Sequence, residues 1–346
     1  MNSAQQQQQP IDFNLKKLVD AATIFPDVFQ KGEKKIQVRV NRSPDCIASN
    51  PNYVPDEQVL RMALAWWNAP IQPQVLGLHG ETGTGKTELL LYIADLLNEP
   101  VYMAKCHPAL MPEDLEGTRI LQDGKTPFIP GPAARAYQQG GLLILDEIDK
   151  LNLASQAAIH GLVEGKPWPI EQIGKTISKH PNTRIAATGN TTGEGGSESY
   201  ISSQRMDDAL RSRIGWIRTN YPEPRTELKI LKKAFPQLPT ELSFLMVKVA
   251  NALRDARLGK DRKGVDDPIG CVCSTRTIVN WAFYTMVYEK KSPWSLALNF
   301  AMSGSIDPES QEAVDAIIQR LLEDDDLELT IDSPVEKFIE AVTSKK

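Results

Sequence analysis

A glycine-rich stretch with a lysine and a threonine is the first set of residues that could do chemistry. Residues 80–87 read GETGTGKT and match G-x-x-x-x-G-K-[ST] at every fixed position. An apolar run precedes them and a stretch of helical periodicity follows, which is the strand–loop–helix context of a phosphate-binding loop. Glycines let the backbone approach phosphate, and amide hydrogens at the helix start point at the anion. We therefore predict a nucleoside triphosphate site in which Lys86 reaches the outer phosphates and the Thr87 hydroxyl binds magnesium.

Two adjacent carboxylates form the second chemical motif. Asp146 and Glu147 end a continuous apolar run, Leu142–Leu145, which is typical of a buried parallel strand that delivers its acids to the carboxyl edge of a sheet. Downstream of a phosphate loop, Asp146 is expected to hold magnesium, and Glu147 to activate the attacking water beside the γ-phosphate. For Asp149 two interpretations stay open: a place in this site, or a cap for the helix that begins near Asn152.

Four further polar residues are candidates for the same site. Asn190 ends a predicted strand, where its amide could hold the nucleophilic water or the γ-phosphate, although asparagine is also a common turn residue. Arg211 and Arg213 do not fall on an apolar face. One of them could reach into a neighbouring subunit's site and neutralise charge on the transferred phosphoryl group, and the alternative is a solvated helix end. Arg276 begins a predicted helix that would aim it at the nucleotide.

The elements that must position these residues indicate an α/β fold followed by helices. Strands are expected at residues 34–40, 75–78, 99–105, 142–146 and 180–190, with hairpins at 119–129 and 162–177. Helices are expected at residues 58–68, 131–139, 226–234, 241–257, 275–288 and 308–322, with a short one at 335–342. Loops are expected at residues 191–203, which are rich in Gly, Ser and Glu, and at the charged residues 258–268. The predicted domains are a partly disordered, Gln-rich N-terminal segment (1–50), a nucleotide-binding core (51–222), a helical lid (223–322) and an acidic C-terminal tail (323–346).

The composition excludes several classes of protein. A net charge of −5 over 346 residues gives no electrostatic support for general nucleic-acid binding. No apolar stretch approaches the length of a membrane span, and the N-terminus lacks an apolar signal core. The four cysteines have irregular spacing that fits neither a disulfide framework nor a zinc site. We expect a cytoplasmic protein in a reducing setting.

Together these motifs resemble the AAA+ ATPases in order and spacing. In that family the matching positions are Walker A (residues 80–87), Walker B (Asp146, Glu147), sensor 1 (Asn190), the arginine finger (Arg213) and sensor 2 (Arg276). The segment around Arg213 resembles the finger region of clamp loaders and RuvB-type motors, which favours it over Arg211. The two hairpins resemble the helix-2 and pre-sensor-1 inserts of the MoxR group. The run from Phe128 into Walker B and the segment 274–281 resemble CobS-like cobaltochelatase ATPase subunits within that group.

The resemblance implies ATP and Mg²⁺ as cofactors and a homo-oligomeric ring, usually a hexamer, with ATP held between subunits. The phosphate-loop residues, Asp146, Glu147 and Asn190 would act within one subunit, Arg213 would act on the neighbour, and Arg276 would act from the lid. The nucleotide would be held by Gly80, Glu81, Thr82, Gly83, Thr84, Gly85, Lys86, Thr87 and Asp146, and the metal by Thr87 and Asp146.

The resemblance also implies partners, namely a client protein and a partner with a von Willebrand factor A domain and a metal-ion-dependent adhesion site. Two features depart from the family: Ile214 stands where an aromatic residue usually follows the finger, and the first fifty residues match no known pattern. The alternatives are an ATPase subunit of a metal chelatase, a DNA-directed motor and a nucleotide-dependent assembly switch. The acidic balance disfavours the motor, and the presence of both Glu147 and Arg213 disfavours the switch.

Overall fold

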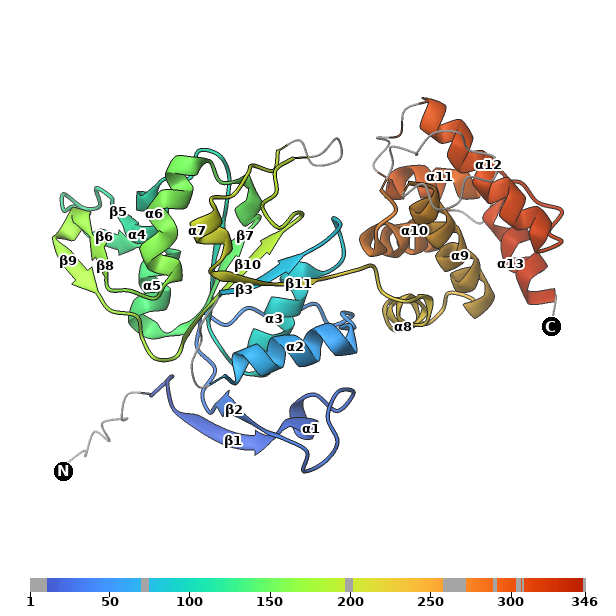
Figure 1. The fold of residues 1–346 in the computed structure, drawn as a ribbon. Coiled ribbons are helices and arrows are strands. Elements are labelled where there is room, and N and C mark those ends of the chain that lie inside the picture. The colour runs from blue at the N-terminus through green and yellow to red at the C-terminus, as the bar shows by residue number, and fades with distance from the viewer. Residues whose placement is uncertain are drawn as a thin grey trace. The chain divides into compact units, whose positions relative to one another are not determined.

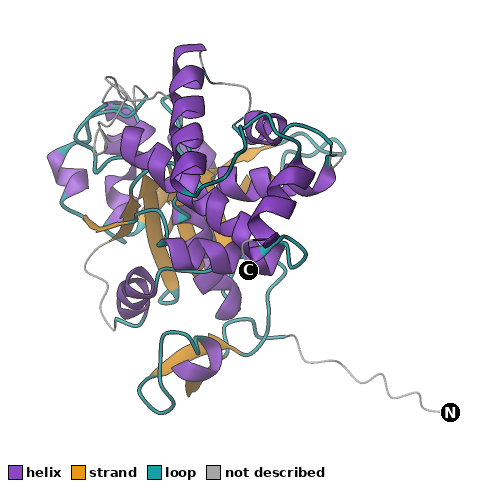
Figure 2. Ribbon diagram, turned by 90° about the vertical axis from the view of Figure 1, so that its right-hand side faces the viewer, coloured by secondary structure: helices purple, strands orange, loops and turns teal. Residues whose placement is uncertain are grey.

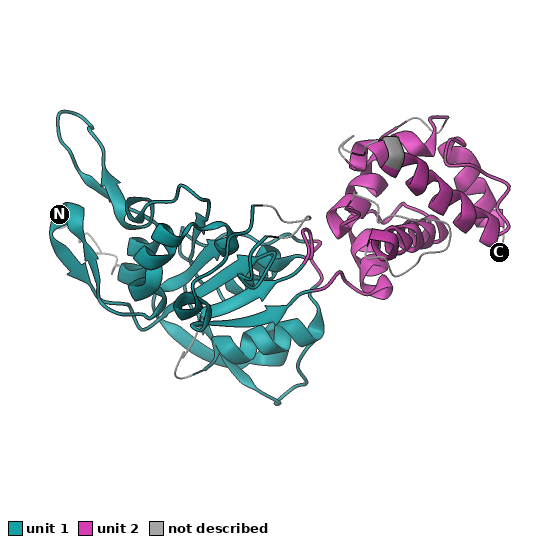
Figure 3. Ribbon diagram, turned by 45° about the horizontal axis from the view of Figure 1, so that its top comes forward, with its two compact units in different colours: residues 1–51, 55–80, 85–219 teal, residues 52–54, 81–84, 220–346 magenta. Residues whose placement is uncertain are grey.

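The computed structural model describes residues 11–69, 75–196, 202–257, 272–288, 291–302, 306 and 308–344. The chain divides into two compact units (Figure 3): unit 1 comprises residues 1–51, 55–80 and 85–219, and unit 2 comprises residues 52–54, 81–84 and 220–346. The glutamine tract and the expected loop at 258–268 lie outside the described residues, as does part of the expected loop at 191–203. Among the described residues, no helix is long and apolar enough to cross a bilayer.

A five-stranded parallel sheet forms the centre of unit 1 (Figure 1), and the predicted α/β fold class is confirmed. The strand order is β11-β3-β10-β7-β4. Strand β7 is buried along its length except at its last residue, as the apolar run predicted. Figure 1 shows α2 and α3 on one side of the sheet and α5 and α6 on the other. The strand bounds are β3 Val75–His79, β4 Val101–Lys105, β7 Gly141–Asp146, β10 Thr183–Gly189 and β11 Ile214–Arg218.

The register of this sheet brings several strand ends to one edge. Gly189 at the end of β10 lies opposite His79 at the end of β3, and Lys105 at the end of β4 lies opposite Asp146 at the end of β7. The helices around the sheet are α2 (Glu57–Trp67), α3 (Lys86–Leu96), α4 (Pro112–Glu116), α5 (Pro132–Gln139), α6 (Leu153–Val163) and α7 (Asp208–Arg211), with 3-10 turns η1 (Ile148–Lys150) and η2 (Glu171–Ile173).

Two antiparallel hairpins project from unit 1 at the predicted places. Arg119 connects them, because its guanidinium donates two hydrogen bonds, of 3.2 and 3.1 Å, to the Gln172 carbonyl of the other hairpin. The first hairpin consists of β5 (Gly117–Arg119) and β6 (Phe128–Pro130), and the second of β8 (Trp168–Ile170) and β9 (Lys175–Ile177).

The N-terminal segment folds as a small module of its own. It contains strand β1 (Lys16–Asp20), helix α1 (Ala21–Ile24) and strand β2 (Lys35–Arg39), and Figure 2 shows α1 beside the two paired strands. The module is attached to the core by a buried charge cluster, since the Glu99 carboxylate lies 2.5 Å from Arg39 Nε and 2.6 Å from Lys16 Nζ. Glu99 follows α3 in the core, so the cluster joins distant parts of the sequence.

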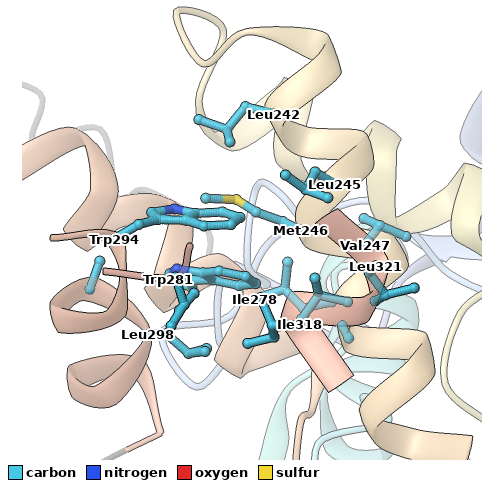
Figure 4. Packing of buried hydrophobic residues seen from close by; sticks show 14 of the residues in the cluster. Leu242, Leu245, Met246, Val247, Ile278, Trp281, Trp294, Leu298, Ile318 and Leu321 are labelled. Atoms are coloured by element: carbon cyan, nitrogen blue, oxygen red, sulfur yellow. The ribbon is translucent and has the colours of Figure 1, made fainter. Parts of the chain in front are cut away.

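Unit 2 is helical and is built around closely packed aromatic side chains, of which Figure 4 labels Trp281 and Trp294. The ring centroids of Trp281 and Trp294 are 4.4 Å apart, and those of Trp294 and Phe338 are 4.3 Å apart. Each of these side chains is fully buried, which contributes roughly 1.5–3 kcal/mol per large apolar side chain. The helices are α8 (Pro224–Ala234), α9 (Thr240–Arg257), α10 (Thr275–Val287), α11 (Trp294–Ala301), α12 (Pro308–Asp324) and α13 (Val335–Ser344).

One prediction about local structure is corrected, two elements are added, and one open alternative is resolved. The expected acidic tail at residues 323–346 is part of the helical fold, because Phe338 of α13 lies in the core of unit 2. Helix α11 and strand β11 were not predicted. In β11, Gly215 interrupts the run of apolar residues that would have indicated a strand. The cap of α6 is Asn152, whose side chain accepts from the Ser155 amide at 2.9 Å, and Asp149 has a different role.

Candidate nucleotide site

The phosphate loop connects β3 to α3, as the motif predicted. Gly80 has a φ of 148°, and a Cβ there would lie 2.1 Å from the Thr219 carbonyl oxygen, so a side chain is excluded on two grounds. Gly85 is left-handed, with a φ of 86°, and turns the chain into α3. Lys86, the first residue of the helix, donates from Nζ to the Gly80 carbonyl at 2.7 Å. The lysine is thereby folded back over the loop that would wrap the phosphates.

Asn190 lies opposite this lysine. Its Oδ1 accepts from Lys86 Nζ at 3.2 Å, although the two residues are far apart in the sequence. The contact arises because β10, which Asn190 follows, is hydrogen-bonded directly to β3 in a parallel register. Parallel neighbours end at the same edge of the sheet, which is where ligands of open α/β sheets bind.

A second contact joins the phosphate loop to the strand-end carboxylates. Thr87 Oγ1 donates to Asp146 Oδ1 at 2.8 Å, and Thr188 Oγ1 donates to the same oxygen at 2.7 Å. The Thr188 hydroxyl in turn accepts from the Glu147 amide at 3.0 Å. The clustered hydroxyl and carboxylate oxygens of Thr87 and Asp146 are the hard donors that Mg²⁺ prefers, so these residues fit that ion. Sequence reasoning missed Thr188; its place one residue before the end of β10 was the available signal.

Glu147 occupies a strained turn at the end of β7. Its φ of 60° is rare for a residue with a side chain and costs about 1–3 kcal/mol. Its carboxylate pairs with Lys150 Nζ at 3.0 Å and lies 3.9 Å from Lys105 Nζ, and 30% of the side chain is exposed. Such strain at a strand end is common where a side chain must face a reacting group. The carboxylate is therefore partly exposed, with its Oε2 buried, and it directly follows Asp146 in the chain.

The surroundings of the two carboxylates keep nearby groups uncharged. Burial, followed by the Asp146 carboxylate, raises the pKa of the Cys106 thiol, so this thiol stays protonated. On the other side, burial, followed by the charge of Arg218, lowers the pKa of His79, which precedes the phosphate loop. Cys106 and His79 are therefore neutral neighbours of the charged groups at this edge.

Arg211 and Arg213 both pair with acids of their own chain. Arg213 Nε donates to Glu164 Oε1 at 2.6 Å, whereas Arg211 lies 3.0 Å from Glu194 Oε1. Hydrogen bonds from Lys166, followed by those from Arg213, lower the pKa of Glu164. The Arg211 side chain is 39% exposed and the Arg213 side chain is 31% exposed. The contacts do not select one arginine over the other.

Arg276 is an exposed residue in the first turn of α10, in unit 2. The start of this helix is fixed by a capping box between Ser274 and Thr277, with the Thr277 amide donating to Ser274 Oγ at 3.2 Å. Thr275 Oγ1 also donates to the buried Glu227 carboxylate at 2.8 Å. The backbone that carries Arg276 is thus held on both sides.

Residues 81–84, in the middle of the phosphate loop, belong to unit 2 and contact other residues of that unit. The Tyr221 hydroxyl donates to the Thr82 carbonyl at 3.0 Å, and a Cβ at Gly83 would lie 2.5 Å from the Ser274 Cβ. Gly83 also has a left-handed φ of 81°. The middle of the loop is therefore held by residues at the start of unit 2 and of α10.

Comparison with known proteins identifies related sequences. Residues 76–214 match the model of the AAA domain (dynein-related subfamily). The chain is 28% identical to the protein NorQ of Paracoccus denitrificans over 239 residues, which cover 68% of the chain and 81% of NorQ. It is 30% identical to the denitrification regulatory protein NirQ of Pseudomonas aeruginosa, over 51% of the chain and 66% of NirQ. It is 26% identical to the protein CbbQ of Hydrogenophilus thermoluteolus, over 44% of the chain and 56% of CbbQ.

A similar solved structure is the Holliday junction branch migration motor RuvB of Thermotoga maritima, with 16% identity and a TM-score of 0.46. The match covers 86% of the chain and 91% of RuvB.

Proposed function

Because the chain belongs to the MoxR group of AAA+ ATPases, we propose that it hydrolyses ATP in order to remodel or activate a client protein. The observation that carries the proposal is the meeting of two strand-end motifs with the phosphate loop. Lys86 contacts Asn190, and Thr87 contacts Asp146, at the edge where β3, β7 and β10 end. These residues supply a cation, a polar amide, a hydroxyl and a carboxylate within one small region.

Each residue has a role that follows from its chemistry. Lys86 would bind the outer phosphates, and Thr87 and Asp146 would hold Mg²⁺, which neutralises phosphate charge when bound. Glu147 would accept a proton from the attacking water, for which its partly exposed carboxylate at the sheet edge is suited. Asn190 would orient that water or the γ-phosphate. The backbone amides of residues 80–85 would line the phosphates.

Assembly into a ring, with six subunits as the expected number, would complete the site. Arg213 is partly exposed on the segment after α7, and its guanidinium would neutralise transition-state charge in the neighbouring subunit. To do so it must leave Glu164, so the Glu164 pair competes with assembly. Arg276 would act from the helical lid of the same subunit. Support for these roles comes from residue chemistry and family membership.

The conformational change driven by ATP hydrolysis would act on a client protein, together with a partner that has a von Willebrand factor A domain. The relative NirQ is described as a denitrification regulatory protein, which supports a regulatory role. The nearer resemblance to cobaltochelatase subunits stays a prediction. The net charge of −5 disfavours a DNA-directed motor.

The test uses Glu147→Gln, which preserves the shape of the side chain while removing the general base. We expect ATP turnover to fall by about 10²–10⁴-fold with nucleotide affinity retained, so that client complexes accumulate. Glu113→Gln, an exposed residue of α4, makes the same chemical change away from the site and should behave as wild type. Affinity purification of both variants with ATP, followed by mass spectrometry, identifies proteins enriched by Glu147→Gln. Unchanged turnover in Glu147→Gln would reject the proposal, and stimulation of turnover by DNA would favour the motor instead.

A further inference from the structure

Asp149 is a buried carboxylate for which the proposed reaction has no direct use. It lies in η1, directly after the strand-end carboxylates, and about 1% of it is exposed. Its Oδ2 accepts hydrogen bonds from the Asn190 amide at 3.1 Å, the Thr191 amide at 3.1 Å, the Thr191 hydroxyl at 3.2 Å and the Ser203 hydroxyl at 2.7 Å. In the described part of the chain no lysine or arginine pairs with it. Its charge is therefore stabilised by neutral donors from the adjoining segments.

The packing around Asp149 is specific to the end of β10. A Cβ at Gly189 would lie 3.3 Å from Asp149 Cγ and 2.8 Å from the Thr191 carbonyl oxygen. A glycine at this position therefore lets the carboxylate reach the next two amides. Those amides belong to Asn190, whose side chain contacts Lys86, and to Thr191. Asp149 thus determines where the backbone of Asn190 lies relative to the phosphate loop.

Asp149 also holds the segment that leads to the candidate arginine finger. Besides the Ser203 hydroxyl bond, its backbone carbonyl accepts from the Gln204 amide at 2.6 Å. The neighbouring Gln156 side chain donates to the Arg205 carbonyl at 3.2 Å and accepts from the Asp207 amide at 2.7 Å. These bonds attach residues 203–207 to η1 and α6, just before α7.

We propose that Asp149 is a positioning residue for ATP hydrolysis. By holding the backbone amide of Asn190, it places the Asn190 side chain, and it also ties this backbone to the segment ahead of Arg213. This inference rests on the proposed function, in which Asn190 orients the attacking water or the γ-phosphate. The hydrogen bonds to the Asp149 side chain come from Asn190, Thr191 and Ser203. Asp149 is therefore assigned no direct contact with the nucleotide. It acts through the Asn190 and Thr191 amides, so its removal should change turnover more than nucleotide binding.

The test is Asp149→Asn in the full-length chain, which keeps the size of the side chain and removes its charge. We expect kcat to fall by at least about tenfold, while the Kd for a fluorescent ATP analogue stays within about twofold. Thr191→Val removes one donor and should lower kcat less, whereas Thr191→Ser keeps the hydroxyl and should restore it. Circular dichroism and thermal unfolding establish that the compared samples are folded.

A double-mutant cycle with Asn190→Ala separates positioning from general destabilisation. If Asp149 acts through Asn190, Asp149→Asn should have little further effect on kcat in the Asn190→Ala background. Additive losses, or full kcat in Asp149→Asn, would overturn the inference. A wild-type protein without ATP turnover would instead defeat the proposed function. Normal turnover that is blocked by Glu147→Gln but unaffected by Asp149→Asn would defeat this inference alone.

Discussion

Asp149 in unit 1 and Glu227 in unit 2 are both carboxylates of which about 1% is exposed. Neutral amide and hydroxyl donors surround Asp149, whereas Glu227 forms a two-pronged ion pair with Arg254, at 2.9 and 2.7 Å. Arg254 further donates to the Cys273 carbonyl and lies 4.2 Å from the centroid of the Tyr221 ring.

The difference indicates two uses of a buried charge. The donors to Asp149 come from the segment that carries Asn190, so its charge organises a candidate reacting group. The ion pair of Glu227 joins α8 to α9, and its bond from Thr275 adds the start of α10. We therefore expect changes at Asp149 to act mainly on turnover, and changes at Glu227 to act mainly on the stability of the helical unit.

The largest effect is expected from Glu227→Gln, which leaves the guanidinium of Arg254 buried without its counter-ion. Removing one partner of a buried pair costs about 3–5 kcal/mol of unfolding free energy. Urea unfolding followed by tryptophan fluorescence measures this change, since Trp281 and Trp294 report on unit 2. Glu340→Gln, on the exposed face of α13, is the matched control and should leave the midpoint unchanged. If Glu227→Gln does not lower the unfolding midpoint, the proposed difference between Glu227, which stabilises unit 2, and Asp149, which acts on turnover, is wrong.

The next effect tests the cation at the sheet edge. Lys86→Ala removes the ammonium that contacts Asn190 and the Gly80 carbonyl, and we expect ATP affinity to fall by about 100-fold, or ~3 kcal/mol. Isothermal titration calorimetry measures the loss. The unfolding midpoint of unit 2 should stay that of the wild type, because Lys86→Ala leaves the ion pair of Glu227 and Arg254 intact. Wild-type ATP affinity in Lys86→Ala would show that the loop binds nucleotide without its lysine.

A smaller effect is expected from Tyr221→Phe, which removes one hydrogen bond and keeps the ring beside Arg254. The lost bond to the Thr82 carbonyl corresponds to about 0.5–1.5 kcal/mol, seen as a severalfold higher KM for ATP. Burial raises the pKa of Tyr221 to about 12, so the hydroxyl remains a donor throughout the assay range. A KM equal to that of wild type at pH 7 and pH 9 would indicate that the phosphate loop does not need this contact.

The last effect is seen only when the pH is raised, and it concerns the Cys106 thiol. Because burial raises its folded-state pKa, its contribution to stability is present below the ordinary thiol pKa and is lost as pH rises above it. We expect the free energy of unfolding to decline between pH 8 and pH 10 by about 1 kcal/mol per pH unit where the unfolded thiol ionises. Cys106→Ala should flatten this slope, whatever it does to stability at pH 7. An equal slope in both proteins would assign the decline to other groups.

The sequence alone determined the parts of this protein that depend on local pattern. The phosphate loop, the acids after β7 and the asparagine after β10 follow from a glycine spacing or from an apolar run that ends in a polar residue. The helices α8, α9, α10 and α12 of unit 2 follow from periodicity, within a few residues. These signals lie inside short windows, where the backbone geometry of one element dictates the residue types.

The tertiary structure decided which distant residues share a charge or a hydrogen bond. Nothing local distinguishes Asp149 from a helix cap, because its donors come from Asn190, Thr191 and Ser203. The same holds for Thr188, and for Glu99, whose partners Lys16 and Arg39 lie in the N-terminal module. The helix at α13 was expected from the sequence, but only the structure shows that its Phe338 lies in the core of unit 2. Desolvated charges must find partners, and only the strand order and helix packing determine which residues those are.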